Sequence, residues 1–436
     1  MKTDTTAAIL VGFLIQAAPL VSPIQGAAQV AEGGALGDET QIRRVTLDEA
    51  LGLIGSNFQL RMTRSTAAEA EALARQSRAY PNPAVSASHE ALGESGLGIS
   101  ESYFTLSQRL EWPGARSARQ EAASESATSA RIRVAADSAA LAFEVKRAYV
   151  EAARAERHAE TLSRVTAIFR QAVESAGERY EEGDLSLYDR RRIEVERVRY
   201  ESSLADAILD LSLARRGLAL LVAPEAGDLQ LAPADPPVGM PPAMNLDRLQ
   251  TLAVSRRPEV AAQVADMRSA RAEQSQARAR RLPDVTANGG LKRQSDGFSG
   301  FFLGMSVPLP MWNRSAGAIE ATDARVSREE TRLALTRREI EEEARSTLEA
   351  YRSQMRRAEF LSEAGESSSF DLLDIAEVAY GAGEMELLGL LDAAQALRDA
   401  EMAEARIRSD LWISYYDLER AVGGFGGLIG QGEEDE

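Results

Sequence analysis

Few residues of this sequence are able to carry out chemistry. Cysteine is absent, so disulfides, thiolate metal sites and a cysteine nucleophile are excluded. The two histidines, His89 and His158, lie 69 residues apart, so a histidine-based metal centre would need ligands from a partner chain. The sequence shows no nucleophile–base set, phosphate-binding loop or metal-ligand spacing. It therefore predicts a protein that is not an enzyme and has no cofactor.

The remaining candidates are carboxylates beside two glycine turns of similar sequence, Gly183-Asp184-Leu185-Ser186 and Gly383-Glu384-Met385-Glu386. Glycine permits a left-handed turn, and an acidic residue is favoured where the next helix begins. Asp189 and Asp392 follow the two glycines by six and nine residues. Carboxylates repeated around a symmetric pore attract cations. A carboxylate on a helix is also an ordinary solvated side chain, so both interpretations stay open at this point.

Charge and hydropathy limit the partners. The formal net charge of −17 argues against nucleic acid, whose phosphates select basic surfaces. An apolar run at 7–18, preceded by Lys2 and followed by small residues, predicts a signal peptide over 1–28, with a flexible segment at 29–45. The alternative is a disordered cytoplasmic tail. No later run of eighteen apolar residues occurs, so we expect any membrane insertion to use β-strands.

The chain is an internal duplication. Trp112 recurs as Trp312, and the segment 183–187 recurs as 383–387, with every matched offset equal to 199 or 200. The copies are predicted at 46–222 and 246–422. A proline-rich linker at 223–245 joins them, and a glycine-rich, acidic tail follows at 423–436.

Each copy contains two alternating segments that predict strands. The apolar positions are candidates for facing lipid, and they are Phe104 and Leu106 in the first copy and Leu303, Met305 and Val307 in the second. The upstream partner segments are 85–91 and 285–291. Trp112 and Trp312 follow the strands and are candidates for the membrane interface, with simple packing as the alternative.

Helices flank the strands. Helical stretches at 47–78 and 246–280 precede them, and long helices at 115–182 and 316–382 follow them. The first long helix would extend on the order of 100 Å at about 1.5 Å per residue. Its apolar positions follow a 4,3 spacing from Val134 to Tyr180, which is typical of a coiled coil. Return helices are predicted at about 187–222 and 387–422.

Four strands per chain require other copies. Four strands cannot close into a barrel, and an open sheet edge cannot face lipid. A dimer would supply eight strands and a trimer twelve, and twelve strands leave the wider lumen. The sequence predicts a mainly α protein with membrane β-strands, whose strand barrel continues into a cylinder of helices. Such an object is a conduit.

Over about 45–425 this order of elements resembles the TolC family of outer-membrane efflux proteins. The segments 110–116 and 308–317, with their Trp-Pro-Gly-Ala-Arg and Trp-Asn-Arg-Ser-Ala-Gly sequences, resemble its CzcC/CusC-like heavy-metal branch. The resemblance implies a homotrimer with a twelve-strand barrel in outer-membrane lipid and a twelve-helix periplasmic tunnel. It also implies a periplasmic adaptor protein, which would contact residues 183–186 and 383–386, and an inner-membrane transporter. An acidic pore ring is implied near Asp392, with Asp189 as second choice.

The predicted function is thus a passive exit duct of a tripartite efflux pump, with heavy-metal cations as the favoured cargo. Drugs, other organic toxicants and exported protein are the alternative cargoes. A soluble periplasmic coiled-coil adaptor or scaffold is the alternative class of protein. Adaptors need a β-rich region around a single helical hairpin, and the sequence shows no such region.

Overall fold

The computed structural model describes residues 41–94, 97–237, 239–241, 249–364 and 368–424. The expected signal peptide at 1–28 lies outside the described residues, as do most of the segment 29–45 and of the tail 423–436. None of the described helices combines the length and the apolar character that crossing a membrane requires.

Short helices open each repeat. They are α1 (Leu47–Gly52), the 3-10 turn η1 (Ile54–Ser56) and α2 (Phe58–Ser77) in the first repeat, and α5 (Leu249–Arg256) and α6 (Pro258–Ala279) in the second. The helical stretches predicted at 47–78 and 246–280 are thus present but are divided into separate helices. The Asn57 side chain accepts hydrogen bonds from the N–H groups of Gln59 and Leu60, which begins α2 afresh. Pro258 begins α6 at its first turn, where proline is tolerated.

Long helices follow the strands of each repeat. They are α3 (Pro113–Glu182) and α4 (Leu187–Val222) in the first repeat, and α7 (Ala316–Ala364), α8 (Ser368–Gly381) and α9 (Leu387–Ala421) in the second. The expected helix at 115–182 and both return helices are confirmed to within two residues. The second long helix is described as two pieces, and residues 365–367 lie outside the description.

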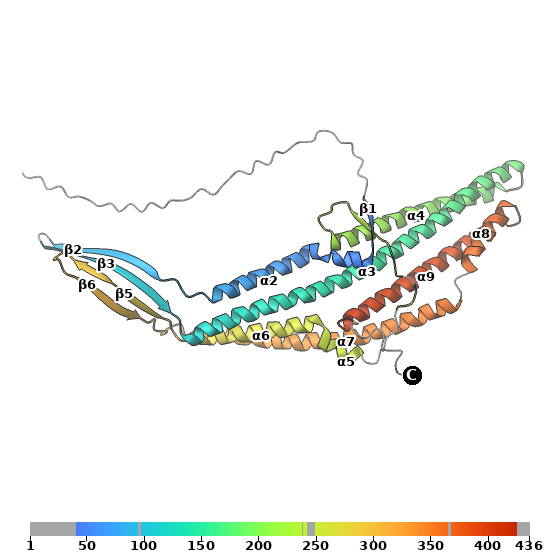
Figure 1. Cartoon of the computed structure of the whole chain (residues 1–436). Helices are drawn as coiled ribbons and strands as arrows, with labels where there is room; N and C mark the ends of the chain where they lie inside the picture. The colour runs from blue at the N-terminus through green and yellow to red at the C-terminus, as the bar shows by residue number, and fades with distance from the viewer. Residues whose placement is uncertain (1–40, 95–96, 238, 242–248, 365–367, 425–436) are drawn as a thin grey trace, which may run out of the picture. The chain divides into compact units, whose positions relative to one another are not determined.

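The four predicted strands form one antiparallel sheet in the order β2-β3-β5-β6 (Figure 1). Their bounds are β2 (Ala84–Glu94), β3 (Leu97–Leu110), β5 (Val285–Gln294) and β6 (Ser299–Ser306). The central pair, β3 and β5, joins the two repeats, with Leu106 opposite Gly289. A Cβ at the adjacent Gly290 would lie 2.1 Å from the Phe104 carbonyl oxygen, so only glycine permits this close approach.

A second, small sheet was not expected. β1 (Ile42–Val45) pairs in parallel with β4 (Gln230–Pro233), so the end of the segment predicted to be flexible and part of the linker are ordered together. The Tyr149 hydroxyl lies 3.1 Å from the Val45 carbonyl oxygen and 3.2 Å from the Asp235 carbonyl oxygen. These contacts fasten the linker to the middle of α3.

The core follows α3, which packs against α2, α4, α6 and α9. None of the positions of the predicted coiled-coil stripe is exposed. Those that are buried are Leu141, Val145, Ala152, Ala159, Leu162, Thr166, Phe169 and Ala176. One cluster contains residues of both repeats, because Phe169 and Tyr200 of the first repeat pack with Tyr380 and Leu390 of the second. The two helical hairpins are therefore held together by a shared core.

Candidate functional site

The two glycine turns have the same backbone geometry. Gly183 has φ 88° and Gly383 has φ 76°, both in the left-handed region. The N–H of each following residue donates back to the preceding helix, Asp184 to the Arg179 carbonyl oxygen at 2.8 Å and Glu384 to the Ala379 carbonyl oxygen at 2.9 Å. This is a glycine-terminated helix C-cap in both copies, as the sequence predicted.

The turns differ in how the next helix begins. Ser186 caps α4, since its hydroxyl accepts from the Asp189 N–H at 3.1 Å and donates to the Asp189 carboxylate at 2.6 Å. Glu386 occupies the same position before α9 but makes no side-chain cap. Asp392 is exposed, and no hydrogen bond or ion pair links it to the described residues. Asp189 therefore has a local structural role, and Asp392 presents a free carboxylate.

The turns contact each other. The Arg179 guanidinium lies 5.4 Å from the Tyr380 ring centroid and donates to the Tyr380 carbonyl oxygen at 3.4 Å. Burial raises the pKa of the Tyr380 hydroxyl, which has no hydrogen-bond partner. Leu185 and Met385 pack onto the shared core. The remaining turn residues, Gly183, Asp184, Ser186, Gly383, Glu384 and Glu386, are exposed and available for a partner.

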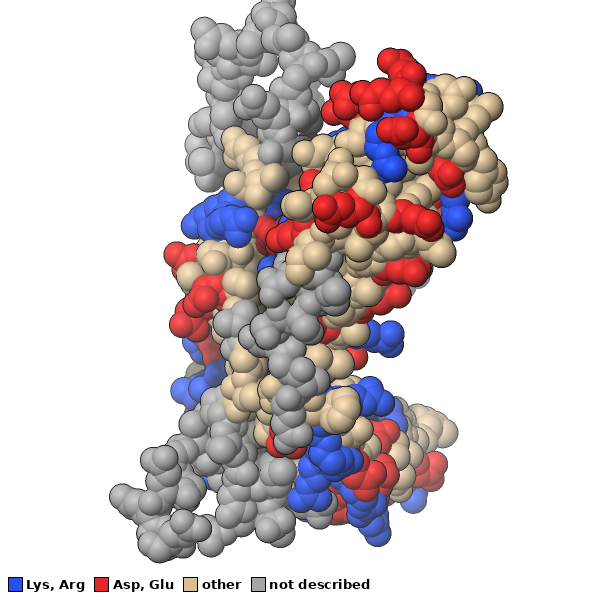
Figure 2. Space-filling model, turned by 90° about the vertical axis from the view of Figure 1, so that its right-hand side faces the viewer, with Lys and Arg blue, Asp and Glu red and all other residues tan. Residues whose placement is uncertain are grey.

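Acidic side chains surround the first turn. Figure 2 views the molecule from the side of the two turns, and Asp and Glu side chains gather in the upper part of that face. The exposed acidic residues next to the first turn are Glu178, Glu181, Glu182 and Asp184. At the second turn they are Glu384 and Glu386, with Asp392 further along α9. Arg190, Arg191 and Arg192 follow the first turn on α4, and the Arg191 side chain is 71% exposed, so the second turn is the more uniformly acidic of the two. A cationic partner would be attracted most strongly to the second turn.

One face of the sheet is an exposed apolar surface. The register aligns Phe104 with Leu291 and Phe301 in one row, and Leu106 with Leu303 in the next. The exposed apolar side chains of this face are Val85, Phe104, Leu106, Leu110, Leu291, Phe301, Leu303 and Met305. Val307 is exposed too, but it lies just beyond β6 and not within the strand predicted for it. An apolar surface of this extent suits lipid contact.

The opposite face of the sheet is largely polar. The Lys292 ammonium lies 2.9 Å from the Glu101 carboxylate. The Tyr103 and Phe302 rings meet edge to face, with their centroids 6.2 Å apart. Each strand thus separates an apolar face from a polar face, as the sequence alternation predicted.

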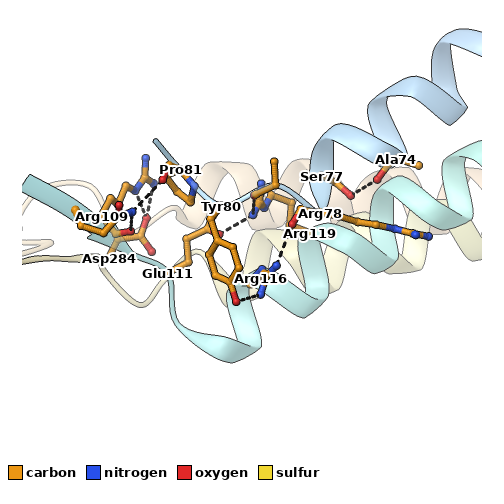
Figure 3. A network of polar contacts seen from close by, with 12 residues as sticks. Ala74, Ser77, Arg78, Tyr80, Pro81, Arg109, Glu111, Arg116, Arg119 and Asp284 are labelled. Atoms are coloured by element: carbon orange, nitrogen blue, oxygen red, sulfur yellow. Dashed lines mark hydrogen bonds and ion pairs between the residues drawn. The ribbon is translucent and has the colours of Figure 1, made fainter. Parts of the chain in front are cut away.

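A polar network joins the sheet to the helices (Figure 3). Arg109 on β3 pairs with Asp284, whose carboxylate lies 2.6 Å from the Arg109 Nε atom. Arg116 stacks on the Tyr80 ring, 3.6 Å from its centroid. The Trp112 indole N–H donates to the Pro283 carbonyl oxygen at 2.6 Å. Trp112 is therefore held in the junction.

Trp312, by contrast, is 91% exposed. The two tryptophans occupy the same place in their repeats, but only the first packs against its own chain. Sequence analysis offered a packing role and an interface role for both residues without distinguishing them.

Known proteins resemble this chain in sequence and in fold. The profile of the family described as outer membrane efflux protein matches residues 249–424. This chain is 25% identical over 386 residues to the cobalt-zinc-cadmium resistance protein CzcC of Cupriavidus metallidurans, covering 87% of this chain and 90% of that protein. The second repeat of this chain matches the outer membrane efflux protein family, which confirms the resemblance predicted from the sequence.

Solved structures show the fold of this efflux channel. The CmeC outer membrane channel of Campylobacter jejuni superposes with a TM-score of 0.73 at 16% identity, covering 88% of this chain and 86% of that one. CusC superposes with a TM-score of 0.68 at 17% identity, covering 87% of this chain and 92% of that one. The outer-membrane channel OprN superposes with a TM-score of 0.70 at 18% identity, covering 87% of this chain and 90% of that one. The predicted TolC-like fold is thereby confirmed, and the predicted outer-membrane location agrees with the family match over residues 249–424. The number of chains in the barrel stays a prediction.

The buried carboxylate of Glu401 was not predicted from the sequence. Glu401 on α9 is buried against α3, where both of its carboxylate oxygens lie 2.7 Å from the Arg164 Nη2 atom. The Thr161 hydroxyl also donates to it. The partners are 237 and 240 residues apart in the chain, so no local spacing reveals them. Within the described ranges, no three His, Cys, Asp or Glu side chains are grouped as metal ligands.

Proposed function

We propose that this efflux channel is the outer-membrane exit duct of a tripartite pump and that it works as a homotrimer. The observation that carries this proposal is an amphipathic four-stranded sheet continued by α3, which is about 100 Å long, and by the helices that pack along it. β2 and β6 are the edges of the sheet, and they run in opposite directions. β6 of one copy is therefore oriented to pair antiparallel with β2 of the next, and three copies supply the wider lumen.

The mass of the detergent-solubilised channel, corrected for bound detergent, tests the stoichiometry. We expect three chains per particle. Two chains would imply an eight-stranded barrel with its interior filled by side chains, and would contradict an open duct. A mature protein found only in the aqueous fraction after cell lysis would contradict membrane insertion itself.

A periplasmic adaptor is the proposed partner of the two turns, and an inner-membrane transporter would supply the energy. Support comes from the exposed turn residues Asp184 and Glu384, which project beyond the shared core. The double variant Asp184→Asn, Glu384→Gln should weaken adaptor capture if charge contributes to docking. The pair Asp206→Asn, Glu339→Gln, whose members are exposed on α4 and α7, is the matched control.

Heavy-metal cations are the proposed cargo. The support is the likeness to a cobalt-zinc-cadmium resistance protein over most of both chains. A host that lacks its own outer-membrane channel, and that carries this channel with its adaptor and transporter, should regain resistance to cobalt, zinc and cadmium. Restored resistance to organic toxicants alone would contradict the metal assignment and leave the duct intact.

Asp392 is proposed to form an acidic ring in the trimer. Its carboxylate is exposed and has no partner among the described residues, so it can attract cations in a lumen. Asp392→Asn should reduce cation selectivity in planar-bilayer recordings, and Asp189→Asn should do so less because Asp189 is hydrogen-bonded to Ser186. Asp206→Asn on the exposed surface of α4 is the control. Unchanged selectivity in Asp392→Asn removes this residue from the pore.

A further inference from the structure

The connections between sheet and helices are basic in an otherwise acidic protein. The chain carries a net charge of −17. The four connecting segments, 78–83, 111–112, 280–284 and 307–315, contain four arginines and two acidic residues. The arginines are Arg78, Arg280, Arg281 and Arg314, and all but Arg314 follow a helix that has one arginine in its last turn.

The two acidic residues of these segments already have partners. Asp284 pairs with Arg109 of β3, and Glu111 lies 2.6 Å from the Arg119 Nη2 atom of α3 (Figure 3). Both partners come from outside the connecting segments. No hydrogen bond or ion pair joins the side chains of the four connecting arginines to the described residues. Arg78 makes its hydrogen bonds through backbone groups, since its carbonyl oxygen accepts from Arg116 and its N–H donates to the Arg75 carbonyl oxygen.

Large apolar side chains stand exposed among these arginines. They are Leu282, Leu309, Met311 and Trp312. Leu282 follows Arg281 directly, and Trp312 precedes Arg314 by two residues. An exposed indole beside free guanidinium groups suits an environment that is apolar on one side and anionic on the other.

The connecting segments lie at the end of the apolar face of the sheet, where a membrane would be apolar on one side and anionic on the other. The apolar face of the sheet runs from Phe104 to Leu110, about 20 Å at roughly 3.3 Å per residue. The connecting segments begin where this face ends, on the side of the helices. If the face meets acyl chains, the arginines lie at the depth of the phosphate groups, where each cation is attracted to an anionic leaflet.

We propose that Arg78, Arg280, Arg281 and Arg314 bind the phosphate groups of anionic phospholipids in the leaflet nearest the helices. The inference rests on the proposed membrane insertion of the sheet. Free phosphate would neutralise the arginines but leave Leu309, Met311 and Trp312 in water. A phospholipid covers both, because its acyl chains continue the contact made by the apolar face. The lipid thereby sets the depth of the sheet in the membrane.

Trp312 provides the probe. The sequence has three tryptophans, and the variant Trp112→Phe, Trp412→Phe leaves Trp312 alone. This full-length protein is reconstituted into phosphatidylcholine vesicles that contain a minor fraction of brominated phosphatidylglycerol or, separately, brominated phosphatidylcholine. We expect stronger quenching by phosphatidylglycerol. Added inorganic phosphate at matched ionic strength should leave the preference unchanged.

The arginines are then replaced. R78Q/R280Q/R281Q/R314Q should reduce the phosphatidylglycerol preference by about fivefold for each arginine removed. The corresponding lysine variant should retain most of the preference, which separates charge from folding. The control R216Q/R337Q/R356Q/R357Q removes four exposed arginines of α4 and α7 and should leave it unchanged.

The outcomes separate this inference from the proposed function. Equal quenching by both headgroups, or an unchanged preference in the fourfold Gln variant, overturns the lipid site and leaves the channel intact. An equal loss in the control variant also overturns it, since the effect would then follow net charge alone. Absence of quenching by either lipid means that Trp312 does not meet a membrane, and membrane insertion of the sheet fails instead.

Discussion

The two glycine turns share a backbone but differ in their side chains. Both end a helix with a left-handed glycine and the same pair of hydrogen bonds. The first turn adds a serine cap and a hydrogen-bonded aspartate, whereas the second has an uncapped glutamate and a free Asp392. Duplication thus preserved the part that shapes the chain. In the second copy Glu386 and Asp392 make no such local contacts, so these two side chains are available for function.

The shared core beneath the turns should give the largest effect when it is broken. Phe169 is fully buried and stacks on Tyr200, with ring centroids 4.6 Å apart. Phe169→Ala should lower the free energy of unfolding by about 3–5 kcal/mol, measured by denaturant titration in detergent. Phe360→Ala removes an exposed ring on α7 and should change it by less than about 0.5 kcal/mol. Similar losses in both variants would mean that the turns do not share a core.

The glycines test whether the turns are equivalent. Gly183→Ala and Gly383→Ala each place a Cβ in the left-handed region, at a cost of about 1–2 kcal/mol. We expect equal losses of thermal stability. Gly217→Ala in the C-terminal part of α4 has open space and a helical backbone, and should instead stabilise by about 0.5–1 kcal/mol. Clearly unequal losses at the two turns would contradict their common geometry.

Two buried tyrosines, Tyr149 on α3 and Tyr351 on α7, allow the long helices of the two repeats to be compared. The Tyr149 hydroxyl is hydrogen-bonded, whereas the Tyr351 hydroxyl has no partner. Tyr149→Phe should therefore cost about 1 kcal/mol, and Tyr351→Phe should be neutral or stabilising at neutral pH. Thermal melts of both variants, run under one condition, give the comparison. A larger loss in Tyr351→Phe would contradict it.

The same tyrosine predicts a pH dependence. Burial raises the pKa of Tyr351 to about 12, whereas an unfolded tyrosine ionises near pH 10. The unfolded state therefore loses its proton first, so this contribution to stability is complete below pH 10 and is lost as the pH rises toward 12. Melting temperatures between pH 9 and 11 should fall less in Tyr351→Phe than in the parent. Parallel curves would exclude this tyrosine as a cause.

The smallest expected effect concerns the caps. Ser186→Ala removes the hydroxyl that accepts from the Asp189 N–H and should cost about 1 kcal/mol. Glu386→Ala at the equivalent position should change stability by less than about 0.5 kcal/mol, because that side chain makes no cap. Differential scanning calorimetry of the pair measures the difference. Equal values would remove the distinction between the turns.

Local patterns predicted most of the fold. Glycines 183 and 383 located both helix reversals, and period-two alternation located all four strands of the larger sheet. These features depend on residues within a few positions of each other. The break before α2 depends in part on distant groups, since the Asn57 amide donates to the Leu221 carbonyl oxygen at 2.9 Å. The sequence around Asn57 gives no sign of that partner.

Candidate site residues were harder to predict. The sequence ranked Asp392 ahead of Asp189 for a pore ring only through the family resemblance, and the structure distinguishes them by the hydrogen bond between Ser186 and Asp189 and by the greater exposure of Asp392. Trp112 and Trp312 were equivalent by position, but Pro283 accepts from the first indole alone. The pairing of Arg164 with Glu401 spans most of the chain. In each case the decisive partner is set by packing and not by spacing along the sequence.

The β3–β5 pairing also determines when the sheet can form. Leu106 and Gly289 are neighbours in space but are separated by 183 residues of chain, including α3 and α4. A nascent chain that has completed only its first repeat therefore holds a lone two-stranded hairpin, which is marginally stable by itself. Sheet formation must wait for the second repeat, and contacts of such long range fold slowly. During that interval the edge of β3 is exposed to unwanted pairing, so synthesis of this protein depends on keeping β3 apart from other strands until β5 has emerged.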